Sequence, residues 1–79
     1  MSIGYTEYIG RTNKKASARL IGVKLGRLCI KHGHPVTKVS STIGVSRQTV
    51  YNWFCGIYEP RNNNLLLVKK YIDELENQK

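Results

Sequence analysis

Three side chains in the run VSRQTVYNWFCG, residues 45–56, carry paired hydrogen-bonding groups close together in the chain: Arg47, Gln48 and Asn52. The guanidinium and amide groups of these residue types match the donor and acceptor pairs on the edges of nucleic-acid bases. A helix that is only solvated more often presents Lys and Glu, which form ion pairs along its face. The residue types in this run therefore indicate recognition of base edges.

A helix over residues 46–55 would have one polar and one apolar side. With residues at about 100° intervals, the polar side is a continuous arc of about 140° that holds Arg47, Gln48, Tyr51, Asn52 and Cys55. Val50, Trp53 and Phe54 fill the opposite side. We expect the apolar side to anchor the helix on a small core. The polar side is then free for the major groove of DNA, which is wide enough to admit a helix.

Residues 16–32, before this run, are expected to form a longer helix. Ile21, Leu25 and Leu28 recur there at helical spacing and face one way. Gly33 follows as a natural C-terminal stop.

The other sides of this longer helix carry two further strips. Lys24, Arg27 and Lys31 share the side opposite the core and are interpreted as a solvated face. Val23 and Ile30 lie on a third strip, away from the main apolar stripe. Three explanations remain open for this third strip: cover by the N-terminal segment, cover by a partner chain, or partial exposure.

A short helix over residues 36–44 and a tight turn precede the polar helix. Val39 and Ile43 face one way in the short helix. Gly44 then allows the left-handed backbone of a turn. Ser46 is a good N-cap for the next helix, since its hydroxyl can accept a hydrogen bond from a backbone N–H of the first turn. Two helices joined by a short turn that contains glycine are the pattern of a helix-turn-helix unit.

The two ends of the chain are expected to differ in structure. Residues 1–15 hold scattered apolar residues and a basic end, RTNKK, and are interpreted as an irregular N-terminal arm. Residues 64–77 predict a last helix. Its expected core stripe consists of Leu65, Val68, Ile72 and Leu75. Tyr71 is placed at the edge of that stripe, whereas Leu66 and Leu67 point elsewhere.

The net charge of +8 is concentrated in the first three quarters of the chain. Residues 11–61 contain ten basic residues and one acid, Glu59, whereas the charges of residues 62–79 balance. Such a field attracts polyanions and raises their association rate. The alternatives are a generally basic surface and contact with an acidic membrane surface. For the second alternative, the basic segments lack the large aromatic face of an interfacial helix.

Several functional classes find little support in the sequence. No apolar run approaches the length of a membrane span, and the first residues do not form a secretory signal. Cys29 and Cys55 are too few for a disulfide framework and are expected to be reduced thiols. No catalytic triad order, phosphate-binding glycine loop or carboxylate pair appears before the tail, where Asp73, Glu74 and Glu76 are interpreted as solvent-facing charges. We therefore expect neither an enzyme nor a small-molecule substrate. The run C-x-x-H-x-H at residues 29–34 lacks a recurring zinc-ligand pairing, so we expect no metal and no cofactor.

Residues 25–72 resemble the Cro and lambda-repressor type helix-turn-helix family of phage and bacterial regulators. The resemblance rests on LGRLCIKHG, VTKVSSTIGVS and TVYNWFCG, on Pro60, and on the leucine-rich last helix. The chain departs from the family at three positions. Val36 stands where the family often has a phosphate-contacting Gln, and Ser40 stands where Ala is usual at the helix crossing. Phe54 replaces a residue that is often charged, and this predicts extra core or an apolar contact.

The resemblance implies which residues would touch DNA. Base contacts would come from the first turn of the polar helix and from a position one turn later, which gives Arg47, Gln48 and Asn52, with Tyr51 and Ser46 as further candidates. We expect Gln48 to read adenine, and Arg47 to read guanine or to clamp a phosphate. The expected phosphate contacts are Lys38, Thr49, Arg61, Asn62, Arg11, Lys14 and Lys15. The last three resemble basic arms that reach into a minor groove. For every one of these residues the alternative is a solvated surface side chain.

The expected fold is all-α, a compact bundle of four to five helices in which residues 16–79 form one DNA-binding domain. The expected function is that of a small, phage-type Cro-like repressor in the bacterial cytoplasm. It would block a promoter by inserting helix 46–55 into the major groove of a double-stranded operator, as a homodimer on two half-sites. The alternative is an RNA-binding module, or an inhibitor that docks on a protein through spare apolar surface.

Overall fold

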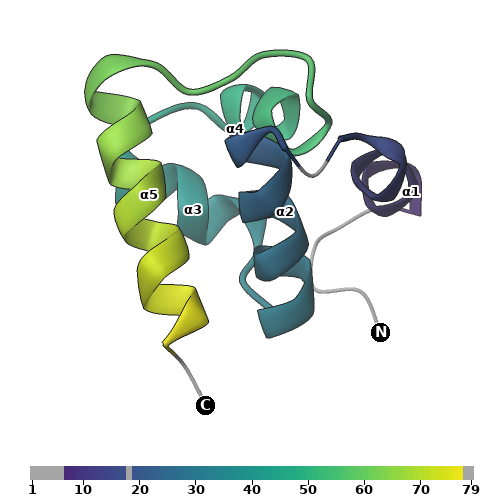
Figure 1. Ribbon diagram of the computed structural model, residues 1–79, viewed down its shortest axis with the longest axis horizontal. Coiled ribbons are helices and arrows are strands. Elements are labelled where there is room, and N and C mark those ends of the chain that lie inside the picture. The colour runs from purple at the N-terminus through teal and green to yellow at the C-terminus, as the bar shows by residue number, and fades with distance from the viewer. Residues whose placement is uncertain (1–6, 18, 78–79) are drawn as a thin grey trace.

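The computed structural model describes residues 7–17 and 19–77, with side chains from Gly10 onward. These residues form five helices and no strand: α1 (Glu7–Lys15), α2 (Ile21–His32), α3 (Val36–Ile43), α4 (Arg47–Phe54) and α5 (Asn62–Glu76) (Figure 1). The prediction of an all-helical fold with four to five helices is confirmed. Residues 1–6 of the predicted arm lie outside the described residues.

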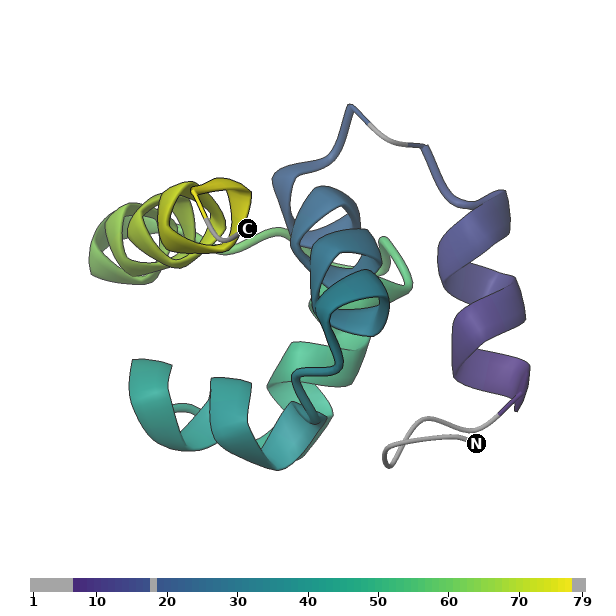
Figure 2. The ribbon, with the colours of Figure 1, turned by 90° about the horizontal axis from the view of Figure 1, so that it is seen from below.

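The central helix of the fold is α2. It packs against α5, α4 and α1, while α3 packs against α4 and α5. Figure 2 shows α5, α2 and α1 side by side, with α3 and α4 together below them. This arrangement leaves α3 and α4 at one side of the molecule, with the rest of the fold behind them.

The core forms where the apolar sides of α2, α3, α4 and α5 meet. Its buried side chains are Leu25, Cys29, Val36, Val39, Ile43, Val50, Trp53, Phe54, Val68, Tyr71, Ile72 and Leu75. Full burial of a large apolar side chain contributes about 1.5–3 kcal/mol. Helices as short as α3 and α4 are unstable alone, so these contacts supply most of their stability. The predicted apolar side of α4 is the side that faces this core.

The helix predicted over residues 16–32 begins later than expected, at Ile21. The preceding residues form a connection in which the Leu20 N–H donates to the Ser17 carbonyl at 3.1 Å. Leu20 itself has an extended backbone, with φ −75° and ψ 127°. The connection is needed because α1 turns back to pack beside α2, as Figure 2 shows.

The prediction of an irregular arm is wrong for residues 7–15, which form α1. Asn13 is only 2% exposed. Its Nδ2 donates to the Val23 carbonyl of α2 at 3.1 Å and to the Phe54 carbonyl of α4 at 2.8 Å. A buried amide that is hydrogen-bonded in this way ties α1 to two helices at once, which a pattern of apolar residues does not reveal.

Arg27, predicted to lie on a solvated face of α2, is half-buried and caps the end of α1. Its Nη2 donates to the Lys14 carbonyl at 3.0 Å and to the Ala16 carbonyl at 2.9 Å. The last carbonyls of a helix have no partner within the helix, and a cation there also favours the helix dipole. Arg27 therefore helps to fix α1 on α2.

Two glycines allow α2 to approach α4 closely. A Cβ atom on Gly22 would lie 2.7 Å from the Trp53 carbonyl oxygen and 2.8 Å from its Cβ. A Cβ atom on Gly26 would lie 2.6 Å from Asn13 Nδ2 and 2.8 Å from Phe54 Cγ. No side chain fits at either position, so these glycines set the distance between the two helices.

The third strip of α2 lies beside α1. Val23 is fully buried, and its carbonyl accepts the bond from Asn13. Ile30 is half-buried next to Gly10 and Asn13. Of the three explanations left open by the sequence, cover by the N-terminal segment accounts for Val23 and partial exposure accounts for Ile30.

The turn between α3 and α4 has the predicted glycine and cap. Gly44 has φ 88°, and its N–H donates to the Ser40 carbonyl at 2.8 Å. Ser46 Oγ accepts the Thr49 N–H at 3.1 Å, as expected of an N-cap. Local chemistry in the sequence therefore predicted the ends of both helices to within one residue.

Two positions of α5 differ from the prediction. Tyr71, expected at the edge of the apolar stripe, is only 6% exposed. Its hydroxyl lies 2.9 Å from Nδ1 of His34, and the connection between α2 and α3 that carries His34 covers the ring. Leu65, expected in the core, is half-buried. Leu66 and Leu67 are exposed, in agreement with the prediction that they point away from the core.

Candidate nucleic-acid interface

The first turn of α4 projects two of the predicted base-contacting side chains into solvent. Arg47 and Gln48 are exposed, while Tyr51 and Asn52, one turn later, are half-buried. Gln48 Nε2 donates to Asn52 Oδ1 at 3.1 Å. This bond holds the two amides together on one side of α4, which orients a set of donors and acceptors before any partner arrives.

Ser46 and Thr49 use part of their hydrogen-bonding capacity at the start of α4. Besides accepting the Thr49 N–H, Ser46 Oγ lies 2.9 Å from Thr49 Oγ1. That contact between hydroxyls needs one hydroxyl hydrogen, so the other can still donate to an outside acceptor. Ser46 therefore has a structural role as N-cap in addition to its predicted contact with DNA.

The opposite side of α4 belongs to the core. Trp53 is 3% exposed and Phe54 is fully buried, so Phe54 extends the core, one of the two alternatives that its residue type predicted. Val36 is also buried. Its apolar side chain packs inside and offers no polar contact to a partner. Cys55 follows α4 as its C-cap and is half-buried.

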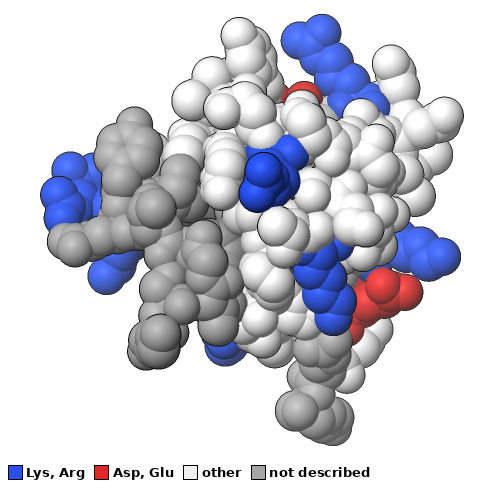
Figure 3. Space-filling view, turned by 180° about the vertical axis from the view of Figure 1, so that it is seen from behind, with Lys and Arg blue, Asp and Glu red and all other residues white. Residues whose placement is uncertain are grey.

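The helices that precede and follow α4 in the sequence also expose cationic and amide side chains. Lys38 is exposed on α3, and Arg61 and Asn62 are exposed where α5 begins. Figure 3 views the molecule from the side of α3 and α4, with Lys and Arg spread across the face and Asp and Glu only at its edges. This side is therefore suited to an anionic partner.

The three cations of α1 are less favourably placed. Arg11, Lys14 and Lys15 are all exposed. Figure 2 shows that the C-terminal end of α1 is the end that lies farther from α3 and α4. Lys14 and Lys15 belong to the last turn, at this end. The structure does not bring these two lysines together with Lys38 and Arg47. The segment expected to reach into a minor groove as an extended arm is a packed helix.

The remaining cations of the α2 strip are surface residues. Lys24 Nζ lies 3.3 Å from Glu76 Oε2, and both side chains are about half exposed, so this ion pair contributes little to stability. Lys31 is exposed. The interpretation as a solvated face holds for Lys24 and Lys31, although it was wrong for Arg27.

The residues of the run C-x-x-H-x-H are divided between the core and the surface. Burial raises the pKa of Cys29 to about 12, so it stays a neutral thiol in the core. Burial, and then the charges of Lys38 and His32, lower the pKa of His34, whose Nδ1 is hydrogen-bonded to Tyr71. Among residues 7–17 and 19–77, no three His, Cys, Asp or Glu side chains come together. The same part of the chain contains no helix with the length and apolar character needed to cross a membrane.

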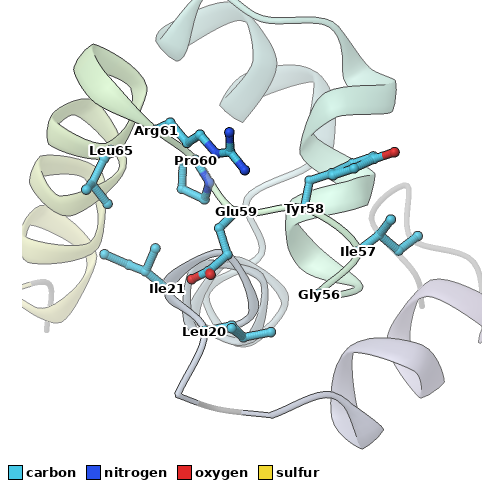
Figure 4. Close-up of a pocket in the computed structure, with 9 residues that line it drawn as sticks. All are labelled: Leu20, Ile21, Gly56, Ile57, Tyr58, Glu59, Pro60, Arg61 and Leu65. Atoms are coloured by element: carbon cyan, nitrogen blue, oxygen red, sulfur yellow. The ribbon is translucent and has the colours of Figure 1, made fainter.

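A cavity of about 640 Å³ opens between the start of α2, the segment 56–61 and the start of α5 (Figure 4). Its walls combine polar and apolar surface in similar amounts, with Glu59 and Arg61 as the charged members. Ile57 and Tyr58, beside it, are 62% and 64% exposed. These side chains add to the spare apolar surface on which the alternative of protein docking depends, and the sequence analysis did not single out Ile57.

Sequence reasoning missed three residues that position α4, namely Asn13, Gly22 and Gly26. Gly22 and Gly26 had a readable signal, because small residues at i and i+4 lie on one face of a helix and permit close approach. Asn13 had no such signal. Asn is a poor helix former, and in a basic segment with glycines it indicates a loop.

The comparisons with known proteins found no similar protein. A search against protein-family models finds no match, and none is found among curated proteins or solved structures.

Proposed function

We propose that this chain is a sequence-specific DNA-binding regulator that inserts α4 into the major groove of double-stranded DNA. The observation that carries the proposal is the pair Gln48 and Asn52, bonded at 3.1 Å beside an exposed Arg47, on a helix whose other side is buried. Arg47 and Gln48 have no packing role in the core. Their residue types match the base edges of the major groove, and the positive charge around them favours a polyanion.

The amide of Gln48 can read adenine while it remains bonded to Asn52. An adenine offers an N6–H donor and an N7 acceptor in the major groove. Gln48 Oε1 would accept from N6, and the second hydrogen on Nε2 would donate to N7, because the first hydrogen is directed to Asn52. Asn52 thus orients Gln48 and can offer its own Nδ2 to a neighbouring base. Arg47 would bond guanine or a phosphate, and Tyr51 would contact a thymine methyl group or a phosphate.

Contacts with the phosphate backbone would fix the orientation of α4. The candidates are Lys38 on α3, Thr49 and Ser46 at the start of α4, and Arg61 and Asn62 at the start of α5. Each neutralised phosphate should steepen the dependence of log affinity on log salt by about 0.9. These contacts are independent of sequence, so specificity would depend on Arg47, Gln48 and Asn52.

We also propose that the regulator is a repressor of the small Cro-like phage type, which acts in the bacterial cytoplasm by occluding a promoter. The resemblance over residues 25–72 and the order helix, glycine turn, helix in α3 and α4 support this reading. A homodimer would place its two α4 helices about 34 Å apart, one turn of DNA, on an operator with two-fold symmetry.

The deciding experiment is selection of bound sequences from random duplex DNA, followed by measurement of variants on the selected site. We expect an enriched motif made of two inverted half-sites. Gln48→Ala should lose about 1–3 kcal/mol of binding free energy on that site and almost none on random duplexes. Asn77→Ala, a similar loss of an amide at the far end of α5, is the control and should bind as the parent does. Equal competition by duplexes of every sequence would reject the proposal.

An RNA partner is disfavoured by the positions of the aromatic side chains. Recognition of single-stranded RNA relies on aromatic rings that stack on bases, and Trp53 and Phe54 are buried. The remaining candidates are Tyr51, which is half-buried on α4, and Tyr58, which is exposed in the segment after α4. Competition between the selected duplex and single-stranded RNA at equal salt separates the two readings, since only the duplex should displace the labelled site.

A further inference from the structure

A second groove, of about 500 Å³, lies between α1 and α2. Its lining residues are Gly10, Asn13, Lys14, Arg27, Ile30 and Lys31. Asn13 and Arg27 hold the two helices together through their bonds to backbone carbonyls. The groove is therefore bounded by two fixed helices.

Gly10 leaves room in this groove that the fold does not use. A Cβ atom on Gly10 would meet no atom of the described residues within 4 Å, whereas the same atom on Gly22 or Gly26 would overlap with its neighbours. Glycine inside a helix lowers its stability, so the packing of the described residues gives no reason for it at this position. The open space lies beside the half-buried Ile30, so an apolar side chain from outside could occupy it.

The charged side chains that line the groove, among those described from Gly10 onward, all have the same sign. Lys14 and Lys31 are exposed, Arg27 is half-buried, and no described acidic side chain contributes to the lining. Arg27 is already bonded to the end of α1, which leaves Lys14 and Lys31 for a partner. A ligand that matches the groove must combine negative charge with a short apolar part.

DNA bound on α4 would not occupy this groove. The last turn of α1, which carries Lys14, lies at the end of α1 far from α3 and α4 (Figure 2). A nucleic acid also lacks the flexible apolar side chain for which the space beside Gly10 and Ile30 is suited.

We propose that the groove between α1 and α2 binds an acidic amphipathic segment of a partner protein. Carboxylates of that segment pair with Lys14 and Lys31, and one of its apolar side chains lies against Ile30 in the space beside Gly10. This inference stands independently of DNA binding by α4.

The test uses the full chain and a fluorescent helical peptide of about 14 residues, with Leu at i, i+3 and i+4 and Glu elsewhere. A second peptide with Gln in place of Glu is the neutral control. Fluorescence anisotropy should show binding of the acidic peptide.

Gly10→Leu fills the groove and should weaken binding by about tenfold or more, although Leu is the better helix former and keeps α1 folded. Lys14→Glu combined with Lys31→Glu should cause a similar loss. Lys69→Glu combined with Lys70→Glu, on exposed positions of α5, should change binding by less than about twofold.

Three results would overturn the inference. They are undiminished binding by Gly10→Leu, equal losses in the two charge-reversal variants, and binding of the Gln peptide as tight as that of the acidic one. Amide chemical shifts of the labelled chain add a fourth criterion. Changes confined to α3 and α4 would mean that the peptide binds as a general polyanion. Gln48→Ala should weaken DNA binding and leave peptide binding intact, so failure of this inference can be told from failure of the proposed function.

Discussion

The helices α1 and α4 both pack against α2, but different kinds of contact hold them there. On α4 the contacts come from Val50, Trp53 and Phe54, which are buried in the core. For α1, the described hydrogen bonds come from the Asn13 amide and the Arg27 guanidinium, which bond to backbone carbonyls. Apolar burial scales with area and is not directional, whereas a hydrogen bond adds about 0.5–1.5 kcal/mol net and depends on geometry.

This difference predicts unequal attachment of the two helices. The α4 helix shares the main core and should open only when the whole domain unfolds. From Gly10 onward, the buried side chain that α1 contributes is the polar Asn13, so we expect α1 to open at a lower free energy, in a local transition that leaves the rest folded. The exposed side chains of α4 would then be held on a helix with a high free energy of opening, whereas α1 would have a lower one.

Removal of the main anchor of α4 should have the largest effect on this comparison. Trp53→Ala should lower the free energy of unfolding by about 3–5 kcal/mol, because it removes a large buried side chain and leaves a cavity. Urea unfolding followed by circular dichroism measures the change. Tyr58→Ala, at a position that is 64% exposed, is the control and should stay within about 0.5 kcal/mol of the parent. A loss below about 1 kcal/mol for Trp53→Ala would mean that α4 is held by something else.

A methyl group added at two glycines should have opposite effects. Gly22→Ala places a Cβ atom 2.7 Å from the Trp53 carbonyl oxygen. The resulting strain should cost about 1–3 kcal/mol, more than the roughly 1 kcal/mol that Ala adds to helix propensity. Gly10→Ala meets no steric obstacle and should raise stability by up to about 1 kcal/mol. Thermal unfolding of both variants provides the measurement, and a stabilised Gly22→Ala would show that α2 and α4 have room between them.

Loss of the buried amide should separate α1 from the rest. Asn13→Ala removes two hydrogen bonds and should cost about 1–3 kcal/mol. Hydrogen exchange should show faster exchange in α1 and nearly unchanged protection in α4. Asn63→Ala, at an exposed position, is the matched control. If α1 and α4 lost protection equally, the proposed difference in attachment would be wrong.

The smallest effect concerns another polar contact, between His34 and Tyr71, which is sensitive to pH. The pKa of His34 is lowered in the fold, chiefly by burial, so folding favours its neutral form. The unfolded chain binds more protons than the native one below the ordinary value of about 6.5. The corresponding stability is present above that pH and is lost as pH falls through the lower native pKa. The urea midpoint measured between about pH 7 and pH 5 should fall more steeply for the parent than for His34→Gln. Identical slopes would show that His34 does not contribute.

The parts of the fold that sequence predicted best are those with short-range chemistry. Ser46 caps α4 and Gly44 makes the turn because cap and turn geometry depend on a few neighbouring residues. The apolar side of α4 was also correct, since Val50 and Trp53 recur at helical spacing. For the candidate site, the same periodicity placed Arg47 and Gln48 in solvent.

The errors concern residues whose partners are distant in the sequence. The bonds of Asn13 to Val23 and Phe54 cross 10 and 41 residues, and nothing local indicates them. Tyr71 looked like an edge residue because its cover comes from His34, 37 residues away. The contact of Lys14 with DNA, based on a resemblance to basic arms, stays a prediction, although the direction of α1 carries its last turn away from α4 (Figure 2).

The sequence by itself determined that α3 and α4 form, where these two helices start and stop to within one residue, and which side of α4 is apolar. Those outcomes depend on interactions between residues within a turn or two of each other. Tertiary structure alone decided that α1 exists as a docked helix, that Arg27 serves it as a cap, and that a cation-lined groove lies between α1 and α2. These features depend on hydrogen bonds and contacts between residues that are distant in the sequence. Only the packing of the whole domain brings such residues together.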